Sequence, residues 1–587
     1  MATTILWPRL WGGAAPKRAH AAGTYSSPLT INDSNYGNGT FSGSWESTNP
    51  DIPAVTVLTS KPVTIINSQV RGPGILIDAP NNAGHSISVI KTSGYGTNPN
   101  IAGRAKDAFV HGDLIANLLV DQCSIEGTAY GVTVNEYTGD KTTNQTIKIL
   151  HNIVHNIDGR NSDGNGGYQN TGSAAPHFVI IGDVRGVPGM EVAWNQVIND
   201  PGNSDVNDVS NFYQTSGTSN SNILVHDNYI QGAYAIDPVH DGYSGGGIIT
   251  DGAQNNTVDT ATAFVNIYNN QIISTTNYGI AIAAGHDNAI HDNRIISAGV
   301  LPDGTPLAAQ NVGTYVANGA NQANSVYFND HSYNNTIGWF NPKDGNQRND
   351  MYFPGDDGDY GRNTVLPNPI TLDTEKAEFP MWQQKLSSAG ITVGAPTASS
   401  SPSAFFNDFE NGSADQWTAQ TGTWTMCVPA MQGATHEYCA TDRNENISFA
   451  GESTWSNYQV EISVLATSSA VNSGIAVLGR VQDASHYYEA ELKQLDDGSF
   501  IWDISKNDGG TWTLLTSGGY NWSTNHYYTL RLDMNGGTLT ASLSSDLGQS
   551  YQTLGTTTDS RFTAGEIGLR AWGGTVGSFD VVRVTQH

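Results

Sequence analysis

A tripeptide pattern, Asn-x-Ile or a close variant, recurs through the first part of the sequence and constrains the fold more than any other feature. Each copy ends a short run of β-branched and aromatic residues, as in Ile223–Ile230, which is typical of a strand that closes at a polar corner. The steps between copies are 43, 33, 42, 23 and 42 residues, so the shortest step defines a bare unit and the others carry inserts. Because no helical periodicity lies between the copies, the repeated strand unit predicts a solenoid. The corner residues are Asn152, Asn195, Asn228, Asn270, Asn293 and Asn335.

A second apolar strand follows the corner in most units, and the inserts lie between the corner and this strand. Because the inserts occupy one place in the unit, they are expected to emerge from one side of the stack and to wall a groove along it. The second strands are expected at 131–134, 178–181, 211–214, 247–250, 279–282 and 313–316. The inserts span 158–176, 199–210, 232–246 and 299–311.

Alternating apolar strands, an asparagine column at one corner and inserts on one side resemble the right-handed parallel β-helix of pectin-lyase-like carbohydrate-active proteins. The resemblance covers the region from Gly23 to Pro367 and implies an all-β fold in which stacked asparagines hydrogen-bond along the column. This fold carries lyases, hydrolases, epimerases and non-catalytic adhesins, so it leaves the chemistry open. The local motifs of the best-known pectate lyases and polygalacturonases are not found, and no residue role is taken from them.

The chain of 587 residues is long enough for at least two domains. Residues 1–22 are expected to be a leader or a disordered tail, and 23–395 the parallel β-helix domain, with one helix over 374–389 as a terminal cap. Residues 396–403 are a linker by their Pro and Ser content. The many alternating strands of 404–587 predict an antiparallel β-sandwich, which resembles the concanavalin- or laminin-G-like jelly rolls appended to glycan-active enzymes as carbohydrate-binding modules.

The composition narrows the class of partner. The chain has 65 glycines and a formal net charge of -28, so it is turn-rich and acidic, and nucleic acid and anionic membranes are poor partners for it. No apolar run approaches the ~20 residues that a membrane span needs. These features favour a secreted protein that acts as a monomer on a polysaccharide.

The C-terminal domain has two further expected features, a metal site and a disulfide. The jelly-roll resemblance implies a structural Ca²⁺ there, and an ordinary solvated acidic turn carries equal weight as an alternative. Cys427 and Cys439 lie close enough in the sequence to bridge, which leaves Cys123 as a buried, inert thiol at an inward corner. The candidate Ca²⁺ ligands are Asp408, Glu410 and Asp580.

Acidic residues just past the second strands form the candidate catalytic column. Strands stack ~4.8 Å apart, so Asp183 and Asp251, with one coil between them, would lie ~10 Å apart, and Glu136 and Asp183 ~5 Å apart. A pair of carboxylates at ~5 Å suits a retaining glycosidase and a pair at ~6.5–9.5 Å an inverting one. The resemblance to β-helix hydrolases, among which inversion is common, favours the inverting geometry. The catalytic candidates are Asp183, Asp251, Asp208, Asp241 and Glu136, and the substrate-binding candidates are Arg160, Tyr168, His177, Tyr213, His240 and Tyr243.

Each candidate also has an ordinary structural interpretation. An Asp before Gly, as at Asp251, more often forms a turn, and His240 beside Asp241 more often belongs to a solvated loop. The prediction therefore rests on the clustering of acids and aromatic rings on one face. Arg160 is the only Lys or Arg in the inserts, which favours a neutral polysaccharide over a polyuronate that needs a cationic clamp. The expected function is a glycoside hydrolase; the alternatives are a non-catalytic glycan-binding or adhesion protein and a Ca²⁺-dependent lyase or epimerase that acts on an acidic glycan.

Overall fold

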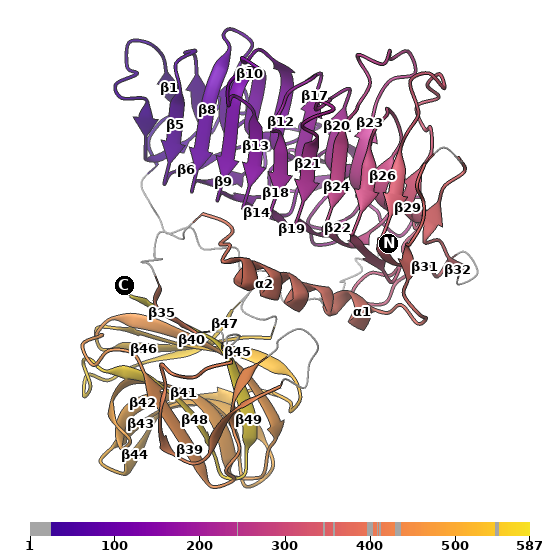
Figure 1. The fold of residues 1–587 in the computed structure, drawn as a ribbon. Coiled ribbons are helices and arrows are strands. Elements are labelled where there is room, and N and C mark those ends of the chain that lie inside the picture. Colours follow the sequence, from indigo (N-terminus) through magenta and orange to yellow (C-terminus); the bar gives the residue numbers. More distant parts are fainter. Residues whose placement is uncertain are drawn as a thin grey trace, which may run out of the picture. The chain divides into compact units, whose positions relative to one another are not determined.

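The computed structural model describes residues 25–243, 245–343, 347–355, 358–395, 403–407, 409, 412–428, 436–545 and 551–586. The chain divides into two compact units, Gly23–Pro396 and a second unit that contains Thr397–His587. Strands dominate both units, and they are parallel in the large sheets of the first and antiparallel in the second (Figure 1). The all-β prediction is therefore confirmed at this level. No helix in the described part of the chain is long and apolar enough to cross a bilayer.

The first unit is a stack of short parallel strands in three columns, here named columns I, II and III. The chain visits columns I, II and III in that order, and each strand pairs with the strand one turn later. Column I contains β1 (Leu29–Ile31), β4 (Val55–Val57), β7 (Ile77–Ala79), the first part of β10 (Ala108–Asp121), β12 (Tyr130–Tyr137), β17 (Val179–Gly182), β20 (Asp208–Tyr213), β23 (Gly246–Asp251), β26 (Tyr278–Ile282), β29 (Val312–Val316) and β33 (Met351–Tyr352). Column II contains β2 (Thr40–Phe41), β5 (Val63–Ile66), β8 (His85–Ile90), the rest of β10, β13 (Ile147–Leu150), β18 (Glu191–Ala193), β21 (Ile223–His226), β24 (Val265–Tyr268), β27 (Ala289–His291) and β30 (His331–Tyr333). Column III contains β3 (Ser44–Glu46), β6 (Gln69–Gly72), β9 (Ser93–Gly96), β11 (Ser124–Glu126), β14 (Ile153–His155), β19 (Gln196–Ile198), β22 (Tyr229–Ala233), β25 (Gln271–Thr275), β28 (Arg294–Ser297), β31 (Thr336–Asn341) and β34 (Thr364–Val365).

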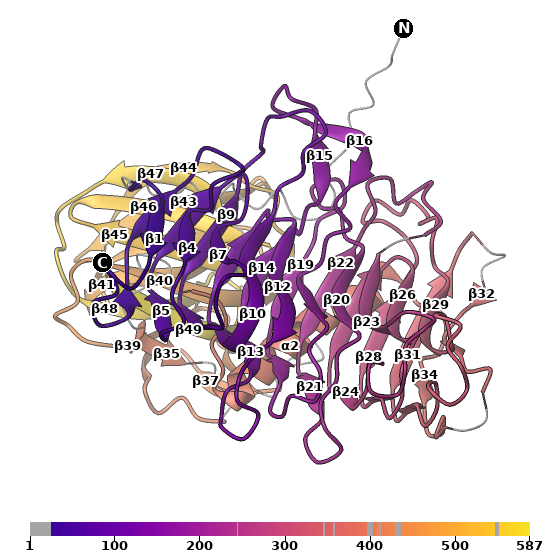
Figure 2. The same ribbon diagram turned by 90° about the horizontal axis from the view of Figure 1, so that it is seen from above.

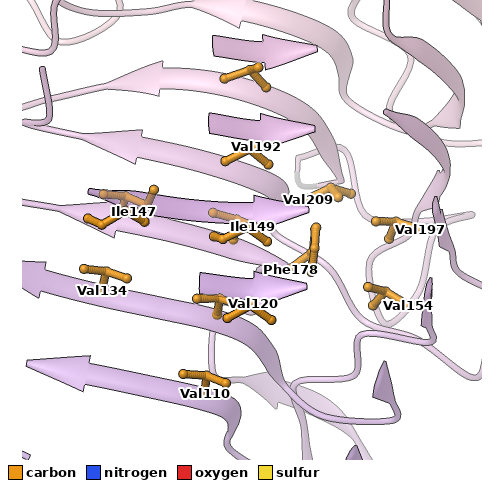
Figure 3. Close-up of a cluster of buried hydrophobic side chains, with 14 of the residues drawn as sticks. Val110, Val120, Val134, Ile147, Ile149, Val154, Phe178, Val192, Val197 and Val209 are labelled. Carbon is orange, nitrogen blue, oxygen red and sulfur yellow. The ribbon is translucent and has the colours of Figure 1, made fainter. Parts of the chain in front are cut away.

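An apolar core runs through this stack. Side chains alternate along each strand, so every second residue points inward. Figure 3 shows inward residues from all three columns, among them Val134 of column I, Ile149 of column II and Val154 of column III. These side chains are at most 2% exposed. Since strands in a column pair in parallel register, apolar residues stack on apolar residues from turn to turn.

The predicted asparagine column is present at the corner between columns II and III. The side-chain amide of each asparagine donates to the side-chain oxygen of the next at 2.8–3.0 Å, and the column continues one turn beyond the predicted set, to Asn363. The residue before each asparagine has a left-handed backbone, as at His151 (φ 54°), which turns the chain at the corner. Cys123 occupies the same corner one turn before Asn152: its backbone N–H donates to the Asn152 side chain at 2.8 Å. The expectation of a buried thiol is confirmed, and burial raises the pKa of Cys123 to about 12.

The predicted helix exists but does not cap the end of the stack. It consists of α1 (Leu372–Lys376) and α2 (Glu378–Ala389), which pack on the outer face of column III (Figure 1). Trp382 is fully buried against Tyr229, and its indole N–H donates to Gln196 at 2.9 Å. Glu378 accepts from Arg294 at 2.8 Å. The prediction of a terminal cap is therefore wrong: apolar residues on the outer face of column III required a lateral cover.

The second unit consists of two antiparallel sheets around an apolar core, as described for residues 403–586 with their gaps. One sheet contains β35 (Ser403–Asn407), β37 (Trp424–Cys427), β38 (Glu437–Ala440), β40 (Tyr458–Ser468), β45 (Tyr527–Asn535), β46 (Thr538–Ser544), β47 (Gln552–Thr558) and β49 (Val576–Gln586). The other contains β36 (Thr418–Thr421), β39 (Glu445–Ala450), β41 (Ser473–Asp483), β42 (His486–Gln494), β43 (Phe500–Asp508), β44 (Thr511–Gly519) and β48 (Glu566–Trp572). A disulfide between Cys427 and Cys439 links β37 to β38. The jelly-roll topology stays a prediction, as does the right-handed β-helix of the first unit.

Candidate functional site

The four inserts all connect column III to column I, as their common place in the sequence unit predicts. They follow β14, β19, β22 and β28 and precede β17, β20, β23 and β29. The first insert contains an antiparallel hairpin, β15 (Arg160–Ser162) and β16 (Tyr168–Ser173), which projects away from the stacked strands (Figure 2). The inserts therefore lie at the edge where the column I strands begin. That they wall a groove stays a prediction.

The structure separates the two acids that the sequence placed in one column. Gly182 pairs with Tyr213, and Tyr213 pairs with Asp251, so Asp183 lies one residue past the row of Asp251. Asp183 has a left-handed backbone (φ 56°), is exposed, and forms an ion pair with Arg185. The predicted pairing of Asp183 with Asp251 is wrong because the chain leaves β17 at Asp183, whereas β23 continues through Asp251.

Glu136 belongs with Asp183 and not with Asp251. It follows Asn135, which pairs with Gly182, so Glu136 and Asp183 are neighbours at the end of column I. Glu136 is exposed and also has a left-handed backbone (φ 55°). Glu136 lies within β12, one residue before its end, whereas Asp183 follows the last residue of β17.

A different pair of acids converges on column I, through an asparagine that the sequence analysis did not single out. Asp208 begins β20 and Asp251 ends the neighbouring β23. The Asn211 side-chain nitrogen lies 3.3 Å from Asp208 Oδ2 and 3.5 Å from Asp251 Oδ2. The distance between Asp208 Oδ2 and Asp251 Oδ2 therefore cannot exceed the sum of these two distances. Asn211 shares a face of β20 with Tyr213, which pairs with Asp251, so strand alternation could have placed it near Asp251 but not near Asp208 three residues earlier.

Asp208 is held from a second direction by Tyr278. Asp208 of β20 pairs with Gly246 of β23, and the Tyr278 hydroxyl, from β26, donates to Asp208 Oδ1 over this glycine. A Cβ at position 246 would overlap both Tyr278 and Asp208, so only glycine leaves room for this contact. Asp208 Oδ2 also accepts from Asn207 at 3.1 Å.

Burial shifts the pKa values of Asp208 and His177. Asp208 is 6% exposed, and burial raises the pKa of its carboxyl group, with the nearby Asp251 acting in the same direction. Burial lowers the pKa of His177, so its ring is neutral at pH 7. The His177 Nδ1 lies 2.8 Å from the Asp208 carbonyl oxygen, and a neutral ring donates its Nδ1 proton there.

Arg160 and Tyr168 support the first insert. The Arg160 guanidinium contacts the buried carboxylate of Asp158 at 2.7 and 3.0 Å and lies 4.5 Å from the centre of the Tyr168 ring. Lys106 lies 4.9 Å from the same ring and forms an ion pair with Asp158 at 2.6 Å. The guanidinium is thus engaged at the base of the hairpin.

The third insert carries three candidates, all exposed. His240 pairs with Asp237 of its own turn at 2.8 Å, and Asp241 accepts from the Tyr243 backbone N–H at 3.0 Å. Tyr243 is 76% exposed. Tyr213, by contrast, is half-buried and shares the row of Asp251. The structure therefore brings Asp208, Asp251, His177 and Tyr213 to one face and keeps the acids of the insert in a local turn.

The predicted Ca²⁺ site in the second unit stays a prediction. Asp408 and Glu410 lie outside the described residues, and Asp580 lies on β49. Within the described part of the second unit, the carboxylates of Glu489, Glu491 and Asp503 lie within 4.8 Å of one another. Arg570 already contacts Glu489 at 3.0 Å and approaches Glu491 at 3.9 Å, and a fixed guanidinium at this place opposes a metal cation.

No family model matches the sequence, and a comparison with curated proteins finds no match. Among solved structures, the carbohydrate binding module CBM66 from Bacillus subtilis aligns with 29% of this chain and 96% of its own, at 19% identity and a TM-score of 0.25. The GH43 protein BlXynB from Bacillus licheniformis aligns with 33% of this chain and 40% of its own, at 14% identity and a TM-score of 0.26. The VIP36 exoplasmic/lumenal domain, in a form with Ca²⁺ and Man3GlcNAc bound, aligns with 29% of this chain and 84% of its own, at 13% identity and a TM-score of 0.25. Likenesses at these TM-scores carry no argument about the function of this chain.

Proposed function

We propose that this chain is a secreted glycoside hydrolase that cleaves a neutral polysaccharide on the outer face of column I. Asp208 and Asp251 are its two carboxylates. The observation that supports this assignment is their convergence on Asn211, with Asp208 fixed by Tyr278. Glycoside hydrolysis needs one carboxyl group that is protonated and a second that is ionised.

The environments of Asp208 and Asp251 differ in the way that a proton donor and an ionised carboxylate require. Asp208 is buried and its pKa is raised, so it is the proton donor to the leaving oxygen. Asp251 is half-buried at the end of its strand and serves as the base or the nucleophile. The separation allowed by the two Asn211 contacts includes the ~5 Å of retaining enzymes and reaches only the lower end of the ~6.5–9.5 Å of inverting enzymes. The anomeric form of the first product, followed by NMR, distinguishes the two courses.

A neutral substrate agrees with the charges of the inserts. Arg160 is their only Lys or Arg, and its guanidinium is engaged by Asp158. A β-eliminating lyase that acts on a polyuronate requires a cationic clamp or bound Ca²⁺ to offset the charge of its substrate. This proposal includes a right-handed, pectin-lyase-like β-helix for the first unit and a jelly-roll, glycan-binding module with a structural Ca²⁺ for the second.

The competing function is a non-catalytic glycan-binding or adhesion protein. It is favoured by one observation: Asp208 is only 6% exposed and accepts from Tyr278, Asn207 and Asn211, which is also the pattern of a purely structural carboxylate.

A panel of neutral and acidic polysaccharides separates these functions. The proposed hydrolase releases new reducing ends from at least one neutral polymer and forms no unsaturated, ultraviolet-absorbing product. Binding without cleavage across the whole panel supports the adhesion protein. An unsaturated product from pectate or alginate supports the lyase.

A further inference from the structure

The Tyr278–Asp208 contact has a geometry that points to a specific role. The two side chains come from strands two turns apart, and each is 6% exposed. The ring of Tyr315 packs edge-on against Tyr278, with 5.5 Å between ring centres and an interplanar angle of 82°. The Tyr278 ring is therefore fixed, and so is the direction in which its hydroxyl donates.

We propose that Tyr278 is a positioning residue: its hydroxyl reaches over Gly246, orients the Asp208 carboxyl group toward Asn211, and stabilises the carboxylate that remains after proton donation. The chemical role of Asp208 rests on the proposed function, whereas the orienting contact does not. In the step itself, the O–H bond on Asp208 Oδ2 and the bond from the anomeric carbon to the leaving oxygen break. A new O–H bond forms on the leaving oxygen, and the anomeric carbon bonds to Asp251 or to a water that Asp251 deprotonates; in the first case water later hydrolyses the glycosyl–enzyme ester. Tyr278 keeps its own proton and donates a hydrogen bond to Oδ1 throughout.

Gly246 is required by space and not by its backbone conformation. Its φ lies outside the left-handed region, whereas a Cβ there would overlap Asp208 Oδ1 and the Tyr278 hydroxyl. Any side chain at this position would push the tyrosine away from the acid. A glycine in the middle of a row of larger residues is thus explained by the contact that it permits.

The charged and titratable groups around Asp208 determine how removal of the Tyr278 hydroxyl changes the pKa of Asp208. Burial and the negative charge of Asp251 raise the pKa of Asp208, whereas His177 and the hydrogen bonds from Tyr278 and Asn211 lower it. Tyr315 and Tyr243 are the other phenols near Tyr278. Without the Tyr278 hydroxyl, Oδ1 loses its donor in a buried place, and the pKa of Asp208 rises further.

The experiment compares Tyr278→Phe with Tyr315→Phe, which removes a hydroxyl from the neighbouring ring. Thermal unfolding of the full chain is measured against pH for each protein, with and without Asp208→Asn. A raised folded-state pKa makes stability fall as pH rises through that value, and Asp208→Asn abolishes this fall. The difference between each protein and its Asp208→Asn counterpart therefore reports the pKa of Asp208 without any substrate.

Tyr278→Phe is expected to move the end of this titration to higher pH, and Tyr315→Phe to leave it in place. If a hydrolysed glycan is known, Tyr278→Phe also moves the alkaline limb of the kcat profile to higher pH and lowers kcat with KM unchanged. If Tyr278→Phe does not fold, 3-fluorotyrosine at position 278 keeps the shape and strengthens the donor, so the titration then moves to lower pH. If the pH at which the Asp208-dependent titration ends is the same in wild type, in Tyr278→Phe and in the 3-fluorotyrosine protein, the proposal is overturned. A shift in a protein that hydrolyses nothing supports the orienting contact and rejects the proposed function.

Discussion

The side-chain amide of Asn195 donates to the side-chain oxygen of Asn228 at 2.9 Å, one step of a column in which each amide serves the next turn. The side-chain oxygen of Asn228 also accepts from the Asn195 backbone N–H at 3.0 Å. The side-chain nitrogen of Asn228 donates to the Asn270 side-chain oxygen and to the Val192 carbonyl. One side chain thus links its own turn to the turns before and after it. Since all of these groups are buried, the column is a structural requirement of the corner.

Replacement of Asn228 by Leu should therefore destabilise the first unit strongly. It removes the acceptor of the Asn195 backbone N–H and of one Asn195 amide hydrogen, and a donor to the Val192 carbonyl, and each buried group left unpaired costs ~1–3 kcal/mol. The loss should be visible as a lower Tm of the first unit in calorimetry. Asn81→Leu, at an exposed position, is the matched control and should leave the Tm within the error of the wild type. Equal stability of the two variants would contradict the structural role of the column.

Asp251→Asn should abolish hydrolysis, whereas Asp183→Asn should preserve it. Asp251 lies beside Asn211 and Asp208, and removal of a general base or nucleophile typically lowers the rate ~10²–10⁴-fold. Asp183 is exposed and paired with Arg185 in a turn, so its amide variant should stay within a few-fold of wild type. Reducing-end assays on the responsive polymer of the panel, with circular dichroism to verify folding, measure both. Loss of activity in Asp183→Asn with full activity in Asp251→Asn would reverse the assignment.

The sequence predicted the repeat well because the repeat is local. At Asn152 and the later corner asparagines, the Asn-x-Ile pattern identifies the corner within three residues. The inserts can then be placed by their distance in the sequence from each corner. The left-handed residue before the corner varies in type. It is Asp or Asn at four corners, types that tolerate this conformation, but at others it is a residue such as His151 or Trp194, whose type gives no sign of it. Backbone hydrogen bonds across the stack enforce that conformation on whichever side chain is present.

The candidate site was harder to predict because it depends on register between strands. A difference of one residue in where β17 and β23 end moved Asp183 off the row of Asp251, and one residue reverses the face of a strand. Tyr278 meets Asp208 across 70 residues, through a glycine whose role is visible only once three strands are aligned. The lateral position of α2 was also not predicted, because the apolar outer face of column III combines residues from several turns that are far apart in the sequence.

Removal of Ca²⁺ should lower the stability of the second unit, because the jelly-roll resemblance implies a structural Ca²⁺ there. Asp580 is the one candidate ligand within the described residues, and a bound ion stabilises the folded state by mass action. The Tm of the second unit should fall on addition of EDTA and recover with excess Ca²⁺ but not with Mg²⁺. Asp580→Asn should remove this dependence, and Asp533→Asn, on β45 of the same sheet, serves as the control. An unchanged Tm in EDTA would reject the metal site.

Glu375 should make the first unit less stable as the pH rises from the acid range toward about 8. It is the buried residue of α1, 2% exposed, and burial raises its pKa to about 8, although its carboxyl group accepts from the Ala298 backbone N–H at 2.7 Å. A raised folded-state pKa gives stability that is complete below the unfolded value, ~4.3, and is lost as the pH rises to the folded value. Glu375→Gln keeps the acceptor and cannot ionise, so its Tm should lack this fall and exceed the wild-type Tm at pH 9. Glu136→Gln, at an exposed position, should follow the wild-type curve. Parallel curves for wild type and Glu375→Gln would show that Glu375 does not titrate in this range, and the buried carboxyl group would then have to be compensated by a partner in the folded state.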